Sequence, residues 1–336
     1  MKDTFLIYKL HFTTPLHLGY ARGDYSVSLK TVASDTMYAA LTSCLAKLGK
    51  EIPEDGDLGF TVSSLFPFYQ KNEGTPAVYF FPKGYKKSKY IKSDTDNEVS
   101  NAKDIKKVQW LDLSYFEKRI ALNENIYSES EHIKGEYLTD KAIDKDFITS
   151  QVSPRVTVSR AGENATPFYM DRIFFKDYSG LYFIVKGDRK LLDMALGLLQ
   201  YEGIGTDRNV GNGLFTYTSD KIEINLPDNN TTEYAMSLSM FIPSSKKQLA
   251  VMLAGEKVGY DFLRRGGWIT TPPFNTKRKN IIYAFTSGSV FSMKMDDNVA
   301  IHGKIVDLKP DIEWEEGKVE HSIWRNGKAL FIPVIV

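Results

Sequence analysis

The sequence predicts an α+β protein made of two ferredoxin-like (RRM-like) domains, the first of which carries a long insertion. Apolar and polar residues alternate with a period of two over residues 6–12, as in a half-buried strand. Apolar residues recur at helical spacing after residue 34 and again after residue 188, and alternating segments follow. The resulting order of strand, helix, strand, strand, helix and strand is that of a ferredoxin-like unit.

The first domain is expected over residues 1–226. Its first helix begins at Ser34 or Asp35, because either side chain can cap a helix N-terminus. Its second helix is capped by Asp188 and ends near Gly203. The strand LFTYTSDKIEI then completes the unit.

An insertion is expected over about residues 50–165, where no simple rhythm holds. A short aromatic strand, AVYFFP, precedes a polar, lysine-rich stretch that is typical of exposed surface. Alternation returns in PRVTVSR and in FYMDRIFFKD. Because the turn DYSG and the strand LYFIVKG come next, the sequence predicts a hairpin between FYMDRIFFKD and LYFIVKG.

The second, smaller domain is expected over residues 233–336, after the polar break NLPDNNTTEY. It begins with the alternating strand YAMSLSMFIP and continues with a short helix, KKQLAVMLAG. It ends with the strand IWRNGKALFIPVIV. This pattern predicts another small α+β unit, again ferredoxin-like.

Composition limits the functional classes. The 336 residues include 42% hydrophobic and 25% charged side chains, as in an ordinary soluble globular protein. Lys plus Arg number 43 and Asp plus Glu number 42, so a polyanion would have to bind a local patch. The single cysteine, Cys44, excludes an intramolecular disulfide and a cysteine-rich zinc cluster. Without a signal-peptide core or a membrane-spanning apolar run, the sequence predicts a cytoplasmic protein with no membrane contact.

The stretch YEGIGTDRNVGNGLF, residues 201–215, is rich in glycine and lies between a helix and a strand. Nucleotide-binding fingerprints require the opposite order, with the helix after the loop. Bare main chain can instead approach a sugar-phosphate backbone and donate N–H groups beside an arginine. Tight turns are the alternative explanation for the glycines. The candidate binding residues of this loop are Gly203, Gly205, Arg208, Asn209, Gly211 and Gly213.

A second basic segment, LRRGGWITTPPFNTKRKN, covers residues 263–280. It has five basic residues and no acidic one. Arginine pairs with phosphate and flat rings stack on bases, so Arg264, Arg265 and Trp268 are candidate nucleic-acid contacts. The alternative is a solvated basic face with Trp268 in the core.

Arginines also accompany the alternating strands near residue 155. Arg155 and Arg160 flank one strand and Arg172 lies on the next. A hairpin that projects from an RRM-like body with such side chains could lie across a nucleic-acid strand.

Signals for an enzyme are weak. The five histidines are scattered, with no metal-ligand spacing and no nucleophile motif, so the sequence predicts neither a metal site nor a cofactor. His17, in the loop after the first strand, could act as a general acid or base on RNA if a second basic group faced it. A loop histidine that only forms hydrogen bonds is the simpler alternative.

Six segments resemble the RAMP superfamily of CRISPR effector proteins, and they span nearly the whole chain. They are FTTPLHLG, SDTMYAALTS, EGIGTDRNVGNGLFTY, RRGGW, SGSVF and WRNGKALFIP. RRGGW and SGSVF make the chain similar to one branch in particular, the fourth subunit of the Csm (type III-A) complex, a relative of the Cas-five group.

The resemblance implies a non-catalytic subunit. Members of this family cap the 5′ repeat-derived tag of the guide RNA (crRNA) and contact the large polymerase-cyclase-like subunit and the neighbouring backbone RAMP subunit. The resemblance also adds His17 and Ser34 to the RNA-binding residues. It implies a β-hairpin thumb, best matched to residues 150–166 with Arg155 and Arg160, that kinks the guide near the tag boundary.

We therefore expect a crRNA-binding module without catalytic activity. One alternative is a metal-independent endoribonuclease of the same superfamily that processes precursor crRNA with His17 as acid or base. Another is a scaffold whose surfaces bind chiefly protein. The near-zero net charge fits a subunit that binds one short RNA segment inside a larger assembly.

Overall fold

The computed structural model describes residues 2–21, 24–86, 104–122, 132–158 and 165–336. As the sequence predicted, the fold is α+β. The larger sheet has nine strands in the order β13-β1-β12-β5-β6-β7-β9-β8, with β4 also paired to β12. Its strands are β1 (Lys2–Phe12), β4 (Phe60–Val62), β5 (Phe66–Tyr69), β6 (Val78–Pro82), β7 (Trp110–Asp112), β8 (Ile133–Lys134), β9 (Tyr137–Leu138), β12 (Gly180–Gly187) and β13 (Phe215–Asn225).

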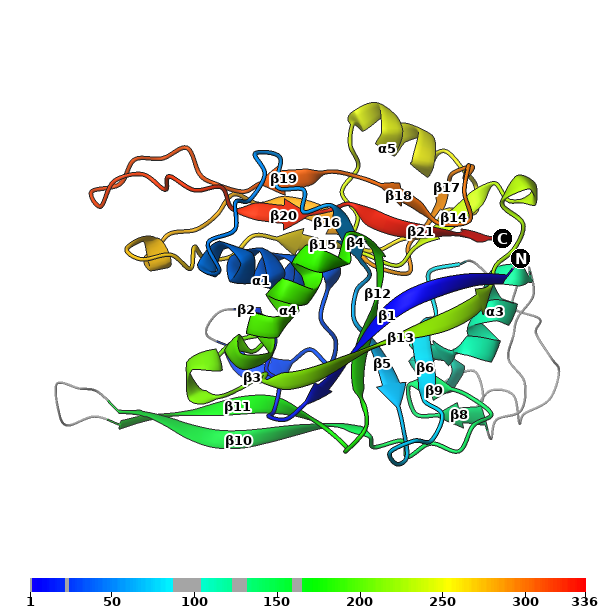
Figure 1. Ribbon diagram of the computed structural model, residues 1–336, viewed down its shortest axis with the longest axis horizontal. Coiled ribbons are helices and arrows are strands. Elements are labelled where there is room, and N and C mark those ends of the chain that lie inside the picture. Colours follow the sequence, from blue (N-terminus) through cyan, green and yellow to red (C-terminus); the bar gives the residue numbers. More distant parts are fainter. Residues whose placement is uncertain (1, 22–23, 87–103, 123–131, 159–164) are drawn as a thin grey trace.

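Two helices, α1 (Ser34–Lys47) and α4 (Arg189–Glu202), pack against one face of this sheet (Figure 1). Side chains alternate along β1, so Tyr8 joins the cluster under the helices while Ile7 joins the cluster on the opposite face. The first strand is therefore buried on both faces in its central part, and not on one face as the alternation suggested.

A four-stranded sheet covers the opposite face. Its order is β17-β14-β21-β18, and every pair is antiparallel. Ile7 of β1 shares one hydrophobic cluster with Leu330 and Ile332 of this sheet. The strands are β14 (Tyr234–Ser237), β17 (Val290–Ser292), β18 (Ala300–His302) and β21 (Ala329–Val334). Because the expected domains 1–226 and 233–336 share this core, their division stays a prediction.

The remaining elements lie around these two sheets. Four two-stranded ribbons pair β2 with β3, β10 with β11, β15 with β16, and β19 with β20. Their bounds are β2 (Gly19–Ala21), β3 (Asp24–Ser28), β10 (Ile148–Val158), β11 (Ala165–Phe175), β15 (Phe262–Arg265), β16 (Ile282–Phe285), β19 (Ile305–Asp307) and β20 (Trp324–Asn326). Further helices include α3 (Leu113–Ala121), α5 (Lys246–Leu253) and the 3₁₀ turns η2 (Arg208–Val210), η3 (Asn229–Thr231) and η4 (Phe274–Thr276).

The predicted hairpin between FYMDRIFFKD and LYFIVKG is wrong. The first of these segments, β11, pairs with β10, whereas β12 pairs with β5 through Gly180 and Phe68. Within the expected insertion at about residues 50–165, β4 and β5 are strands of the larger sheet and both pair with β12. Residues 60–68 are buried throughout, so they show no period-two alternation to reveal a strand.

The C-terminal unit also differs from the prediction of a second ferredoxin-like unit. In chain order its main strands lie second, first, fourth and third across the sheet, and residues 233–336 contain a single α-helix, α5. A ferredoxin-like unit carries two helices between its strands.

The two long helices begin where the sequence predicted, at Ser34 and after Asp188, but only the predicted cap of α4 is correct. The Asp188 carboxylate accepts a hydrogen bond from the backbone N–H of Lys190, and Gly203 ends α4 with a φ of 75°. By contrast, Ala33 occupies the N-cap position of α1. Ser34 and Asp35 lie inside the first turn, where their side chains bind residues of the C-terminal unit instead.

Candidate nucleic-acid interface

The glycine-rich loop that follows α4 folds back on itself and on the loop after β1. The backbone N–H of Ile204 donates to the carbonyl of Gly213 at 3.0 Å, and that of Gly213 donates to the carbonyl of Pro15 at 2.8 Å. The backbone N–H of Thr206 donates to the carbonyl of His17 at 2.9 Å. The two loops thus form one packed layer beneath η2.

Packing explains three of the four glycines. A Cβ atom would lie 1.9 Å from the Ile204 carbonyl oxygen at Gly213, 2.3 Å from the His17 carbonyl oxygen at Gly205, and 2.7 Å from a carbonyl oxygen at Gly203. At Gly211 nothing lies within 4 Å, and only the φ of 87° favours glycine. These glycines therefore have a sufficient reason inside the chain, and their contact with RNA stays a prediction.

The polar side chains of this loop point to solvent. Arg208 and Asn209, both on η2, are exposed. Among the ion pairs of residues that the structure describes, none uses Arg208. Its guanidinium group is therefore available to an anion.

His17 lies beneath the surface. It has no exposed area, its Nδ1 lies 2.6 Å from the carbonyl oxygen of Asp171, and the Tyr25 ring lies 5.8 Å from its own. Because a carbonyl oxygen only accepts, Nδ1 must carry the hydrogen. His17 cannot touch RNA or transfer a proton to it in this conformation, which is a correction to its expected role.

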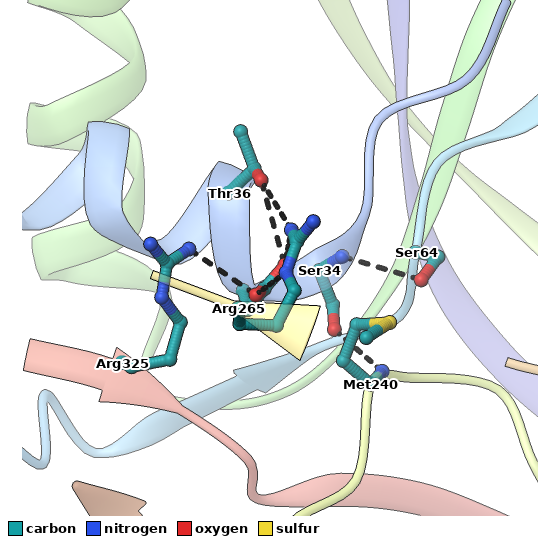
Figure 2. Close-up of polar contacts among 7 residues, drawn as sticks. Ser34, Thr36, Ser64, Met240, Arg265 and Arg325 are labelled. Atoms are coloured by element: carbon teal, nitrogen blue, oxygen red, sulfur yellow. Dashed lines mark hydrogen bonds and ion pairs between the residues drawn. The ribbon is translucent and has the colours of Figure 1, made fainter. Parts of the chain in front are cut away.

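Ser34 is also a structural residue. It is 4% exposed, and its hydroxyl accepts a hydrogen bond from the backbone N–H of Met240 at 2.8 Å. Its own backbone N–H donates to the Ser64 hydroxyl (Figure 2). Ser34 therefore joins α1 to the C-terminal unit and does not face a ligand.

The two arginines of the RRGGW turn behave differently. Arg264 is exposed, whereas Arg265 reaches from β15 to the start of α1. There its Nε and Nη2 donate to the two carboxylate oxygens of Asp35 at 2.6 and 2.5 Å, and Nη2 also donates to the Thr36 hydroxyl (Figure 2).

A second arginine shares the same carboxylate. Nη1 of Arg325, on β20, donates to Asp35 at 3.1 Å (Figure 2). Asp35 has no exposed surface, so burial alone would raise the pKa of its carboxyl, but Arg265 and Arg325 outweigh burial and lower that pKa. Asp35 therefore stays ionised at neutral pH.

Trp268 is half-buried and has its ring covered on one side. The Arg278 guanidinium lies 4.8 Å from the centre of the Trp268 ring, in a cation–π contact, and the backbones of the two residues form a β-bridge. The Arg278 side chain therefore already covers part of the Trp268 ring, which the sequence predicted to stack on a base.

The β10–β11 ribbon extends away from the body of the molecule (Figure 1). It begins at residue 148 and returns at residue 175, so it is longer than the expected thumb at 150–166. Arg155 is half-buried and pairs with Phe168, whose ring lies 5.4 Å from Tyr25 of β3. Arg160 lies outside the described residues.

Several predicted segments meet in one cleft of about 670 Å³. The loop after β1, the glycine-rich loop and the RRGGW turn all line it. Its lining includes Tyr25, Thr206, Arg264, Arg265, Trp268 and Arg325. Arg208 and Asn209 line a neighbouring hollow that shares Thr206 with this cleft.

Asp35 and Arg325 were missed as site residues. Both lie in segments that stand out in the sequence, SDTMYAALTS and WRNGKALFIP, but the two residues are 290 positions apart. The sequence holds one signal for Asp35. It is a charged residue on the buried face of a predicted helix, and a buried charge needs a partner.

The described parts of the chain contain neither a candidate metal site nor a candidate membrane-spanning helix. No group of three or more His, Cys, Asp or Glu side chains could hold a metal ion there. In the same residues, no helix is long and apolar enough to cross a membrane.

Comparison with known proteins gives consistent results. Residues 230–334 match the family model described as the CRISPR Csm4 C-terminal domain. The chain is 28% identical to a protein of Streptococcus thermophilus named "CRISPR system Cms protein Csm4", over 98% of this chain and 100% of the relative. It is 24% identical to the protein of the same name from Thermococcus onnurineus, over 70% and 74% of the two chains.

Solved structures share the fold. A chain of the Csm1-Csm4 cassette in complex with cA4 superposes with a TM-score of 0.60 at 18% identity and 99% coverage of both chains. A chain of the Csm3-Csm4 subcomplex of the type III-A CRISPR-Cas interference complex gives a TM-score of 0.57 at 19% identity, covering 99% of this chain and 100% of that one.

Proposed function

We propose that this chain is a Csm4-type protein of the RAMP superfamily and a non-catalytic subunit of a type III-A CRISPR (Csm) interference complex. It binds and caps the 5′ repeat-derived tag of the crRNA. It also bridges the large polymerase-cyclase-like subunit to the backbone RAMP subunits. The carrying observation is the cleft in which three sequence segments meet, with the exposed Arg208 and Arg264 beside it.

The chemistry of these side chains supports RNA as the ligand. A guanidinium group binds phosphate through two parallel hydrogen bonds, and Arg208 and Arg264 present such groups to solvent. The neighbouring Tyr25 and Trp268 supply aromatic surface of the kind that bases stack on. A local patch of this kind is compatible with a net charge of +1.

The partners follow from the relatives. The similar solved chains belong to assemblies whose names contain Csm1 or Csm3, together with Csm4. We extend those partners to this chain as the large subunit and the backbone subunit. We further assign its first unit to the ferredoxin-like class, because β13, β1, β12 and β5 are adjacent and α1 and α4 connect them.

Charge reversal in the glycine-rich loop tests RNA binding. We expect Arg208→Glu to weaken binding of tag-bearing crRNA more than Arg208→Gln, because glutamate adds repulsion to the lost pairing. Filter binding at low salt measures both variants, and Lys247→Glu on the distant helix α5 is the matched control (Figure 1). Equal affinity of all three variants and the wild type would contradict the proposal.

The other two functions give different outcomes. Cleavage of labelled precursor RNA by the purified protein, lost in His17→Ala, would favour the endoribonuclease, although the burial of His17 argues against it. A pure scaffold would still assemble with both partner subunits and would show no dependence on Arg208. Co-expression with those subunits, followed by sequencing of the co-purified RNA, distinguishes the scaffold from the RNA-binding module.

A further inference from the structure

The ion cluster at the start of α1 does not balance its charges. Asp35 contributes one negative charge, and Arg265 and Arg325 contribute two positive charges. The three side chains are 0%, 18% and 10% exposed, so water screens them little. A buried charge without a counter-charge is costly, and one guanidinium group of this cluster has no carboxylate of its own.

Two further observations accompany this surplus of positive charge. Nε of Arg325 is buried and has no hydrogen-bond partner among the residues that the structure describes. Burial, and then the charge of Arg325, lower the pKa of Lys279 to about 8. Arg265 acts in the same direction, and only Asp35 opposes it. The surroundings of Arg325 and Lys279 therefore carry more positive than negative charge.

The surplus lies beside a cleft that can accept an anion. Arg265 and Arg325 both line the cleft of about 670 Å³, together with the hydroxyl-bearing residues Thr36, Thr206 and Thr270. Asp24 is the single acidic residue of that lining. Forked guanidinium groups and hydroxyl donors around one space match the oxygen atoms of a phosphate group.

We propose that this cleft binds a phosphate group against Arg265 and Arg325, and that Asp35 positions the two guanidinium groups. The phosphate belongs to an RNA backbone or to a free nucleotide. RNA is favoured because Arg264 lines the same cleft and the exposed Arg208 lines the neighbouring hollow, so a strand of several nucleotides would meet more than one guanidinium group. The choice of RNA rests on the function proposed above, whereas the phosphate site itself does not.

Substitution of Arg325 tests the phosphate site in a protein that we expect to remain folded. Arg325→Met leaves Asp35 and Arg265 as a balanced pair, so we expect the variant to fold. Arg325→Lys keeps the charge and serves as the second variant. The matched control is Lys328→Met, which removes one positive charge next to β20 whose partner is Asp57, outside the cleft.

The first arm measures RNA. For the full-length protein and tag-bearing crRNA, we expect Arg325→Met to lower affinity about tenfold, the effect of one charged hydrogen-bonding contact. The slope of log affinity against log salt concentration should fall by about 0.7, as for one lost phosphate contact on a single strand. Lys328→Met should change neither value to this extent, and Arg325→Lys should restore part of both.

The second arm measures adenosine monophosphate and uses the proton on Lys279 as the reporter. The charged and titratable residues around Lys279 are Arg265, Arg325, Asp35 and, along an adjoining groove, Glu54 and His321. A bound phosphate adds negative charge and raises the pKa of Lys279 above about 8, so binding at pH 8 takes up protons. Calorimetry in two buffers of different ionisation enthalpy measures this uptake, which should shrink in Arg325→Met.

Each outcome decides between the sources. Loss of RNA affinity and of salt slope in Arg325→Met supports an RNA phosphate. Binding of the mononucleotide that depends on Arg325, with RNA affinity unchanged, supports a free nucleotide. Wild-type protein that binds no RNA but shows this nucleotide dependence refutes the proposed function and retains the site. If neither ligand responds to Arg325→Met in folded protein, the phosphate site is wrong.

Discussion

The glycine-rich loop at 203–213 and the RRGGW turn at 264–268 both combine glycine with arginine. In the loop the surrounding chain constrains a glycine, whereas in the turn it constrains an arginine. In the loop, Gly213 is fixed by the chain around it and Arg208 is exposed. In the turn, no atom of the described residues lies within 4 Å of a Cβ position at Gly267, and Arg265 is bound to a buried carboxylate. A glycine beside an arginine thus does not by itself identify a ligand contact.

The difference shows whether the fold requires the glycine or the arginine of each segment. Where a Cβ atom would overlap a carbonyl oxygen, the glycine is required by the fold and says nothing about RNA. Where the arginine already has two hydrogen bonds to Asp35, the arginine is required by the fold. Packing does not explain the exposed Arg208 and Arg264, so they stay candidates for direct contact in addition to the two arginines of the proposed phosphate site.

The largest expected effect is at Asp35. Asp35→Asn leaves two poorly solvated guanidinium groups without their counter-charge, so we expect a loss of ~3–5 kcal/mol in the free energy of unfolding. Urea denaturation followed by circular dichroism measures it. Asp57→Asn, which removes a more exposed partner of Lys328, should cost less than ~1 kcal/mol. Equal losses in the two variants would refute the structural role of the buried cluster.

The pH dependence of Asp35 gives a second measurement of the same prediction. Its pKa is lowered in the folded state, so the stabilisation that it contributes is fully present above the usual aspartate pKa of about 3.9. This contribution is lost as the pH falls through the folded-state pKa. The difference in stability between the wild type and Asp35→Asn should therefore be constant at neutral pH and shrink below about pH 4.

The next effect compares glycines of the two motifs. In Gly213→Ala the new methyl group meets the Ile204 carbonyl oxygen and the backbone keeps a φ of 76°, so we expect a loss of about 3 kcal/mol from overpacking and strain. Gly267→Ala meets no atom and retains only the strain of its φ of 104°, at about 1 kcal/mol. Thermal unfolding of both variants checks this order, and the reverse order would contradict it.

The smallest effect is at Arg208. Arg208→Gln should change the free energy of unfolding by less than ~0.5 kcal/mol, because the side chain is exposed and forms no ion pair with the described residues. Arg265→Gln should cost more, because it removes two hydrogen bonds from Asp35. A large loss in Arg208→Gln would show that the loop arginine is structural as well.

The sequence correctly predicted those elements that depend only on residues close together in the chain. Alternation found β1, and the Asp188 cap and Gly203 end of α4 were correct because capping depends on adjacent residues. The partner of β11 was not predictable in the same way, since alternation marks a strand without naming its neighbour. β4 and β5 were missed because burial on both faces removes the alternation.

The candidate site shows the same limit. Arg208 and Arg264 are exposed, as a binding role requires, but their contacts with RNA stay predictions. His17 and Ser34 are buried by chain segments remote in sequence. Asp35 lies 230 positions from Arg265 and 290 from Arg325, so no window of sequence holds the three together.

Those separations matter while the chain is being synthesised. Asp35 leaves the ribosome long before either arginine, and its carboxylate must remain hydrated until β15 and β20 have been made. The N-terminal end of α1 can close only when the last part of the chain arrives. A nascent chain that stops before residue 325 therefore keeps this end of the helix open and exposed to proteases, although every strand of its larger sheet has been synthesised.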